Sequence, residues 1–185
     1  MKYNLPLFIS IAFLSFLYQS CKPQQGQAAN TKQESAKQDS TPTKQTSKFV
    51  NNYKGEKIEK TEEEWKAELS KEEYYVIREK GTERAFTGDL FSYKKAGLYT
   101  CRACELPLFN SDTKFESGTG WPSFYDAIDS TYIATDTDYL LGYPRIEIMC
   151  GRCLGHLGHV FNDGPEPTGL RYCVNSASLD FISKP

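Results

Sequence analysis

The sequence predicts a mainly β fold of the α+β class: an antiparallel β domain with helices at its N-terminal side. Two helix-capping patterns lie ahead of Gly81. Beyond Gly81 the chain changes to short aromatic and β-branched runs broken by Gly, Pro, Asn and Asp, which is typical of strands and turns. Two Cys-x-x-Cys pairs lie among these runs, where they could hold the strands together.

The first 21 residues have the pattern of an export signal. Lys2 supplies a positive start, and an apolar run over 5–17 is shorter than the roughly 20 residues needed to cross a bilayer. Cys21 ends a stretch that resembles a bacterial lipobox, in which the cysteine becomes the lipid-bearing first residue. Two positions before it depart from the usual lipobox. We therefore expect a membrane-anchored lipoprotein of the cell envelope, with a secreted or periplasmic soluble form as the alternative.

A polar segment follows this signal. Residues 22–48 include no aromatic residue and no Val, Ile or Leu, so they cannot bury enough apolar surface to fold. We expect a disordered tether over 22–52, which would span roughly 30 Å, and a folded domain over 53–185. A net charge of −2 with no basic stripe gives no reason to expect a nucleic-acid partner.

The start of the domain predicts two helices. Thr61 with Glu64, and Ser70 with Glu73, match the capping box in which the first side chain and the backbone of the third following residue bond reciprocally. Gly81 is expected to end the second helix.

The sequence RIEIMC, residues 145–150, alternates as a strand with one buried face does. The alternation places Ile146, Ile148 and Cys150 on one face. It places Arg145, Glu147 and Met149 on the other.

The two Cys-x-x-Cys pairs share one spacing. Cys101 with Cys104 and Cys150 with Cys153 form two knuckles that together match a tetrahedral four-cysteine zinc site. Two disulfides are the main alternative in an exported protein. Thioredoxin-like redox motifs are disfavoured because no βαβ pattern surrounds them. Four thiolates leave no open position on the metal, so a zinc ion here would be structural.

The only histidines of the chain, His156 and His159, follow the second knuckle closely. Because the four cysteines satisfy a metal alone, the histidines favour acid–base chemistry. A hydrolytic metal site that uses them, or plain packing in a β corner, remains open at this point.

Cys173 lies apart from the other cysteines. If residues 171–181 form a strand, Arg171 and Asn175 share its face, since side chains alternate along a strand. A guanidinium favours the thiolate and an amide can donate a hydrogen bond to it, which predicts a nucleophile. Upstream, Trp121 in SGTGWPSF is mounted between Gly120 and Pro122, either as the wall of a small apolar pocket or as a core residue.

These stretches resemble the methionine-R-sulfoxide reductases of the B type. The resemblance covers nearly all of 60–181 and follows the family pattern in order. Its segments are GTERAFTG (81–88), YTCRAC (99–104), PLFNSDTKFESGTGWPSF (107–124), RIEIMCGRC (145–153) and HLGHVFNDGPEPTGLRYCVNSASLDF (156–181). It implies a β-rich fold with flanking helices, often with a four-cysteine zinc, that reduces the R epimer of methionine sulfoxide, free or in proteins.

The resemblance also implies site roles. Cys173 matches the nucleophile, and Trp121 matches the residue that contacts the substrate methyl group. Polar groups around the sulfoxide match His156, His159 and Asn175, and a nearby cation matches Arg171. Thr82 and Glu83 belong to a further motif near the substrate.

The cysteine count predicts how the enzyme is reset. Attack by Cys173, with a proton from His159 or a water that it holds, leaves a sulfenic acid. Many family members carry a resolving cysteine, but here four cysteines are expected on zinc and Cys21 on lipid. We therefore expect an external, thioredoxin-like reductant, with resolution by a free Cys21 as the alternative. A zinc-ribbon-like binding module without chemistry would leave Arg171, Cys173 and Asn175 unexplained.

Overall fold

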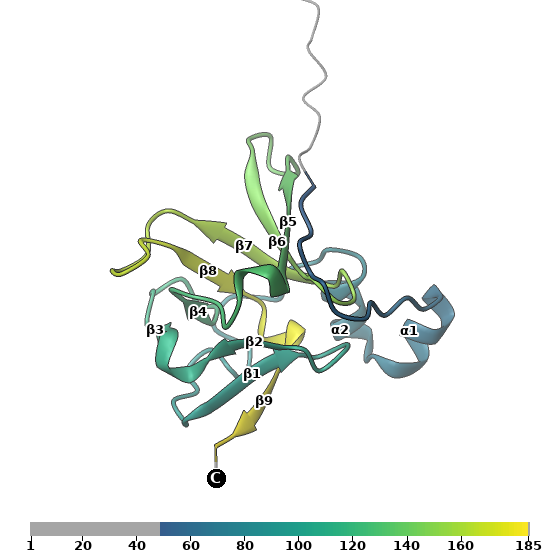
Figure 1. The fold of residues 1–185 in the computed structure, drawn as a ribbon, viewed down its shortest axis with the longest axis horizontal. Helices are drawn as coiled ribbons and strands as arrows, with labels where there is room; N and C mark the ends of the chain where they lie inside the picture. Colours follow the sequence, from purple (N-terminus) through teal and green to yellow (C-terminus); the bar gives the residue numbers. More distant parts are fainter. Residues whose placement is uncertain (1–48, 185) are drawn as a thin grey trace, which may run out of the picture. The chain divides into compact units, whose positions relative to one another are not determined.

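A computed structural model describes residues 49–184, which form two antiparallel sheets and two short helices (Figure 1). One sheet has three strands in the order β2-β1-β9, and the other has six in the order β3-β4-β8-β7-β6-β5. The helices are α1 (Glu62–Glu68) and α2 (Lys71–Ile77). The strands are β1 (Gly97–Cys101), β2 (Pro107–Asn110), β3 (Lys114–Phe115), β4 (Ser123–Phe124), β5 (Ile133–Asp138), β6 (Arg145–Cys150), β7 (His156–Phe161), β8 (Arg171–Val174) and β9 (Leu179–Ser183). The predicted mainly β, antiparallel class is confirmed.

The N-terminal predictions fall mostly beyond this part of the chain. The signal over 1–21, with Cys21, and the tether up to residue 48 lie outside the described residues. Val50, near the end of the predicted tether, exchanges two backbone hydrogen bonds of 2.8 Å with Thr135 on β5. The folded region therefore already includes Val50. Within residues 49–184, no helix has the length and apolarity that crossing a membrane requires.

Both predicted capping boxes are present. Thr61 and Ser70 are the N-caps, and each bonds reciprocally with the glutamate three residues on. The predicted end of the second helix was wrong: it stops at Ile77, ahead of Gly81. The Gly81 N–H donates to Tyr75 O at 2.9 Å, and a Cβ on Gly81 would lie 2.3 Å from the exposed ring of Tyr75, which would have to move aside.

Residues 171–181 do not form one strand as predicted. The chain runs through β8, makes a short 3-10 turn over Ser176–Ser178, and continues as β9 in the other sheet. The backbone N–H of Val174 and that of Asn175 already bond to loop and strand neighbours, Pro122 and Leu157. Asn175 therefore lies beyond the strand that carries Cys173, at the crossing between the two sheets.

The strand predicted over 145–150 is confirmed as β6, but its burial does not alternate. Ile146 is 44% exposed, whereas Glu147 is 3% exposed. Burial rises along β6 towards Cys150, because that end runs into the core between the two sheets. A charged side chain is thus buried where the alternation predicted a solvent-facing one.

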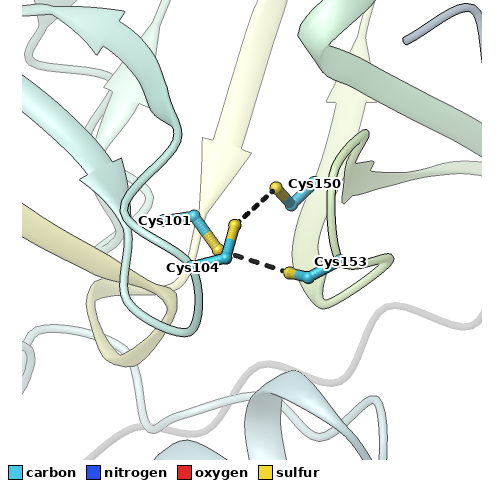
Figure 2. A group of neighbouring side chains, drawn as sticks. All are labelled: Cys101, Cys104, Cys150 and Cys153. Atoms are coloured by element: carbon cyan, nitrogen blue, oxygen red, sulfur yellow. Dashed lines mark hydrogen bonds between the residues drawn. The ribbon is translucent and has the colours of Figure 1, made fainter. Parts of the chain in front are cut away.

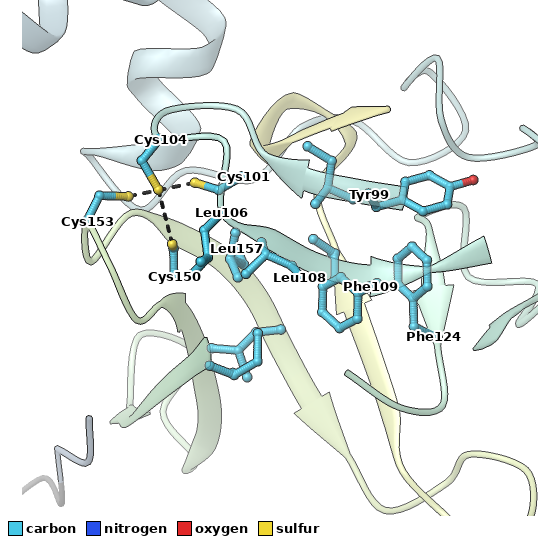
Figure 3. Close-up of a cluster of buried hydrophobic side chains, with 14 of the residues drawn as sticks. Tyr99, Cys101, Cys104, Leu106, Leu108, Phe109, Phe124, Cys150, Cys153 and Leu157 are labelled. Atoms are coloured by element: carbon cyan, nitrogen blue, oxygen red, sulfur yellow. Dashed lines mark hydrogen bonds between the residues drawn. The ribbon is translucent and has the colours of Figure 1, made fainter. Parts of the chain in front are cut away.

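The core joins the two sheets along one continuous cluster (Figure 3). At one end the ring of Phe109 stacks on that of Phe124 at 4.4 Å, with Tyr99 edge-on at 4.9 Å. Leu106, Leu108 and Leu157 lead from these rings to the four cysteines at the other end. The cysteine cluster therefore continues the hydrophobic core.

Candidate functional site

The two Cys-x-x-Cys pairs form knuckles with the same backbone hydrogen bonds. In the first, the N–H of Glu105 donates to Cys101 O at 2.8 Å, and in the second the N–H of Leu154 donates to Cys150 O at 2.9 Å. Glu105 and Leu154 each take a left-handed conformation, with φ of 61° and 58°. This turn aims both thiols of a knuckle at the same point (Figure 2).

The sulfur positions fit one tetrahedral ion. Cys101 Sγ lies 3.7 Å from Cys153 Sγ, and Cys104 Sγ lies 3.5 Å from Cys150 Sγ. Four sulfurs around zinc, each at about 2.3 Å, would be separated by roughly 3.8 Å. The thiols are free, and their separations exceed the roughly 2.05 Å of a disulfide bond. The four residues therefore cluster where a metal could bind, as predicted, and disulfides are not formed.

The knuckles connect the two sheets. Cys101 ends β1 of the three-stranded sheet, and Cys150 ends β6 of the six-stranded sheet. An ion held by both knuckles would fasten one sheet to the other. The second knuckle also leads directly into β7, which carries both histidines.

Cys173 occupies the middle of the six-stranded sheet. Its Cα partner on β4 is Ser123, and its partner on β7 is His159. A cavity of about 110 Å³ opens beside the Cys173 side chain, lined by Thr82, Trp121, Arg145, Gly158, His159, Phe161, Cys173, Val174 and Asn175. A Cβ on Gly158 would lie 2.0 Å from the carbonyl oxygen of Cys173, so glycine is needed for β7 to approach β8 there.

The charge state of Cys173 is set by opposing effects. Burial raises the pKa of the thiol above its usual value, while a hydrogen bond with Thr119 and the charge of Arg171 act to lower it. Thr119 Oγ1 lies 3.8 Å from the sulfur. The predicted help from Arg171 is present, but burial outweighs it. The thiol is therefore the resting form at neutral pH, where the prediction expected an activated thiolate.

Arg171 is itself held in a rigid arrangement. Its guanidinium donates two hydrogen bonds of 2.8 Å to the carboxylate of Asp163 and lies 4.4 Å from the centre of the Phe161 ring. Planar bidentate pairing fixes the orientation of a guanidinium. Arg171 is thus presented to Cys173 without freedom to swing away.

Asn175 lines the cavity, but its amide is used by the backbone. Its Nδ2 donates to Leu157 O at 3.0 Å, and its Oδ1 accepts from the Glu83 N–H at 3.1 Å. The hydrogen bond that the sequence predicted from this amide to the Cys173 sulfur is therefore not made. Asn175 instead ties the 82–83 segment to β7.

Thr82 and Glu83 have separate places. Thr82 lines the cavity, whereas the carboxylate of Glu83 is buried beside it and accepts from the N–H groups of Ser176 and Ala177 at 2.6 and 2.8 Å. Burial raises the pKa of Glu83, and these hydrogen bonds oppose the rise. Its carbonyl oxygen accepts from Trp121 Nε1 at 3.2 Å. Glu83 thus supports the cavity wall through these bonds, and its predicted contact with substrate stays a prediction.

His159 belongs to a hydrogen-bonded series with Asp138 and Arg145, to which the sequence analysis gave no role in the site. Its Nε2 lies 2.8 Å from Asp138 Oδ2, which also accepts from Arg145. Burial acts to raise the pKa of Asp138, but hydrogen bonds from Leu140 N–H, His159 and Arg145 lower it to about 2. Because an ionised carboxylate only accepts, His159 carries its proton on Nε2. Burial lowers the pKa of His159, and the bond to Asp138 opposes this.

His156 is buried behind His159, with the ring centres 5.6 Å apart. Its Nδ1 lies 2.8 Å from Glu147 Oε1, and Lys80 bonds the other carboxylate oxygen at 2.8 Å. Its Nε2 is buried without a hydrogen-bond partner in the part of the chain described. The two histidines thus pair with separate carboxylates, and the metal-binding cluster found within residues 49–184 consists of the cysteines alone.

The residues missed by sequence reasoning are Thr119, Asp138, Arg145 and Glu147. Thr119 lies within the SGTGWPSF motif, so its nearness to Cys173 could have been suspected. Asp138 and Arg145 are paired across the β5–β6 hairpin. Their opposite charges at the two ends of a turn could have indicated this pairing. Glu147 gave a misleading signal, because the alternation assigned it to solvent.

Comparison with known proteins places this arrangement in a family. The SelR domain matches residues 69–183. The chain is 61% identical over 128 residues to a protein of Methanosarcina mazei called peptide methionine sulfoxide reductase MsrB, a match that covers 69% of this chain and 91% of that protein. Proteins of the same name from Thiobacillus denitrificans and Leptospira interrogans are 57% and 56% identical over 125 and 124 residues, each covered to 95% of its length.

Proposed function

The chain belongs to the SelR-domain family of peptide methionine sulfoxide reductases, and we propose that it reduces the R epimer of methionine sulfoxide to methionine, free or in proteins. The observation that carries the proposal is the cavity in which Cys173, His159 and Trp121 meet. It is small enough to take the end of one side chain, and it combines an apolar wall with a thiol and a proton-bearing ring.

In the first step Cys173 acts as the nucleophile. Attack of the Cys173 sulfur on the sulfoxide sulfur forms a sulfur–sulfur bond. The oxygen then passes to the Cys173 sulfur as its bond to the substrate sulfur and the new sulfur–sulfur bond break, so methionine leaves and Cys173 is left as a sulfenic acid. A sulfoxide sulfur becomes electrophilic when its oxygen is protonated or hydrogen-bonded. Protonated His159, or a water that it holds, supplies that proton. The ionised Asp138 favours the doubly protonated ring.

The remaining residues hold this geometry. Trp121 is fixed through its bond to Glu83 O and lies against the cavity, where it would contact the methyl group of the substrate. Arg171 favours the thiolate that forms when the proton of the Cys173 thiol passes, through His159 or a water that it holds, to the sulfoxide oxygen. His156 and Asn175 support His159 and the cavity wall. Preference for the R epimer would follow because the methyl group has its place against Trp121 and the oxygen has its place near His159.

The sulfenic acid needs an external reductant in this proposal. Two thiols of a thioredoxin-like protein would return Cys173 to the thiol, releasing water and leaving a disulfide on the partner. Cys101, Cys104, Cys150 and Cys153 are buried as one cluster. They are better placed to hold a structural Zn²⁺ than to resolve Cys173.

The proposed site of action is the cell envelope. The export-signal pattern over 1–21 and the polar segment up to residue 52 support a lipoprotein anchored through Cys21, with a soluble exported form as the alternative. There the protein would repair oxidised methionine in envelope proteins. Labelling with a palmitate analogue tests the anchor, since wild type would incorporate it and Cys21→Ser would not.

A two-epimer assay tests the proposed activity. With dithiothreitol as reductant, the protein should consume methionine-R-sulfoxide and leave the S epimer. Cys173→Ser should abolish the reaction, because no other described thiol lies in the cavity. Loss of both epimers at the same rate, or of neither, would contradict the proposal.

A thioredoxin-coupled assay tests the reset. Turnover by a Cys21→Ser variant should equal that of wild type, since Cys21 takes no part in the proposed cycle. Loss of thioredoxin-dependent turnover in that variant, with dithiothreitol-dependent turnover retained, would assign the resolving role to Cys21.

A further inference from the structure

The tip of the β5–β6 hairpin concentrates exposed apolar side chains. Among residues 49–184, five of the eleven large apolar side chains that are exposed lie between residues 139 and 146. Leu140 is 81% exposed and Leu141 is 57% exposed. Contiguous apolar surface of this kind marks an interaction site more often than scattered single residues do.

The fold does not require these side chains. The turn closes through Gly142, whose N–H donates to Tyr139 O at 2.9 Å and whose φ of 81° suits glycine. Polar residues would serve such a turn equally well. The loop stands clear of neighbouring strands at the top of Figure 1. Its leucines are exposed and do not belong to the core cluster.

The tip is attached to the catalytic cavity. Asp138 and Arg145, the pair at the base of the loop, both belong to the hydrogen-bonded series of His159. A wider depression of about 360 Å³, lined in part by Tyr139 and Leu140, shares Thr82, Arg145 and His159 with the cavity of Cys173. A ligand that places one side chain beside Cys173 can therefore continue over this depression to the tip.

The chemistry of the surface favours a polypeptide over a membrane. Asp136 and Asp138 precede the tip, and residues 136–144 include no Lys or Arg. Anionic lipid surfaces attract basic segments and would repel this one. β5 is also the outer strand of its sheet, and beyond the Val50–Thr135 pair its remaining edge has no strand partner among the described residues. Such an edge accepts an extended peptide.

We propose that residues 139–143 are a docking surface for a flexible polypeptide that carries methionine sulfoxide, and that they bind apolar residues next to the oxidised one. The proposal rests on the proposed reductase function. Methionine is usually buried among apolar neighbours. A loosened segment that exposes an oxidised methionine therefore exposes apolar side chains with it, and these match the tip.

The test compares substrates of different size on the full chain. The Leu140→Ser/Leu141→Ser variant changes two exposed side chains, and Ile182→Ser, at an exposed position on β9, is the matched control. The substrates are a blocked single residue of methionine-R-sulfoxide, a flexible peptide with leucines flanking that residue, and the same peptide with serines. We expect kcat/KM of the variant on the leucine peptide to fall about tenfold, which is a loss of about 1.4 kcal/mol. Values for the blocked residue and for Ile182→Ser should stay within about twofold of wild type.

The outcomes separate the proposals. If wild type reduced none of the three substrates, the reductase function would fail and the docking surface with it. If wild type were active and the variant lost nothing on the leucine peptide, or lost the same factor on the blocked residue, the docking surface alone would be overturned. The docking surface would also be overturned if the variant kept its kcat/KM on the leucine peptide but bound phosphatidylcholine–phosphatidylglycerol vesicles less than wild type does.

Discussion

Cys173 is a thiol whose surroundings both protect and prepare it. Burial raises its pKa, so the resting protein exposes little thiolate to stray oxidants. The hydroxyl of Thr119 and the guanidinium of Arg171 act in the opposite direction, and each is fixed by further bonds. Thr119 bonds Ser117, and Arg171 bonds Asp163. A hydrophobic substrate that enters the cavity meets a sulfur already equipped with donors for its ionised form.

Replacing Thr119 should make the sulfur less acidic. Thr119→Val removes a hydrogen bond to the thiolate, so the pKa of Cys173 should rise further. The rate of Cys173 alkylation by iodoacetamide, followed against pH by mass spectrometry, should increase at higher pH than in wild type. Thr87→Val, which loses only a bond to Arg84 O, is the control. An unchanged alkylation profile would mean that Thr119 does not act on the sulfur.

His159 depends on Asp138 for its protonated form. The carboxylate, with its pKa lowered to about 2, remains ionised throughout the working range, so it always favours the charged ring. Burial of the ring works against that form. Asp138→Asn should therefore lower the pKa of His159 and move the descending limb of kcat/KM to lower pH, with reduced activity at neutral pH. Asp136→Asn, on the same strand, should leave the profile in place. If both variants kept the wild-type profile, His159 would not be the proton source.

At the scale of elements, the turn between β8 and β9 determines where the site is built. Cys173 lies three residues before this turn, and the buried Glu83 caps the turn through the Ser176 and Ala177 amides. The same residue holds Trp121 through its carbonyl oxygen. Glu83 thereby links the substrate wall, through its backbone carbonyl, to the end of the nucleophile strand, through its carboxylate.

Glu83→Gln should loosen this junction. The side-chain NH2 group of the glutamine would face the backbone N–H of Ser176 or of Ala177, so one buried donor would lose its acceptor. We expect the free energy of unfolding to fall by about 2 kcal/mol, measured by urea denaturation, with a rise in KM if the shifted backbone of residue 83 carries Trp121 with it. Glu116→Gln, at an exposed glutamate, should do neither. Equal stability of Glu83→Gln and wild type would show that the two amide bonds do not matter.

For the whole molecule, the four-cysteine cluster forms one end of the core that joins the two sheets. Its two knuckles end β1 and β6, which belong to different sheets. A structural metal contributes its binding energy to folding. Removing zinc should therefore lower the free energy of unfolding by several kcal/mol.

Metal analysis and thermal unfolding check this expectation. One zinc per chain should be present, and a strong chelator should lower Tm together with activity. Cys173→Ser should retain the zinc, since Cys173 is not a ligand. A chelator that removed activity while Tm stayed unchanged would point instead to a catalytic metal.

Much of this architecture follows from local sequence signals. Capping boxes located both helices, and the repeated Cys-x-x-Cys spacing identified a cluster that the fold brings together. Sequence patterns gave wrong or no predictions where the position of a side chain depends on tertiary packing. Glu147 is buried because His156 and Lys80 compensate its charge, and no alternation pattern contains that information. Asn175 left the predicted strand face because the chain changes sheets beside it. Asp138 reaches His159 only through pairing across β5, β6 and β7.

A single turnover without reductant tests the central claim, that Cys173 is the nucleophile. One equivalent of methionine-R-sulfoxide is mixed with fully reduced protein, and released methionine and modified cysteines are quantified. We expect up to one methionine per chain, with a sulfenic acid on Cys173 that dimedone traps and mass spectrometry locates. Methionine released from a Cys173→Ser variant, or a trapped oxygen on any of the four clustered cysteines instead, would contradict this claim.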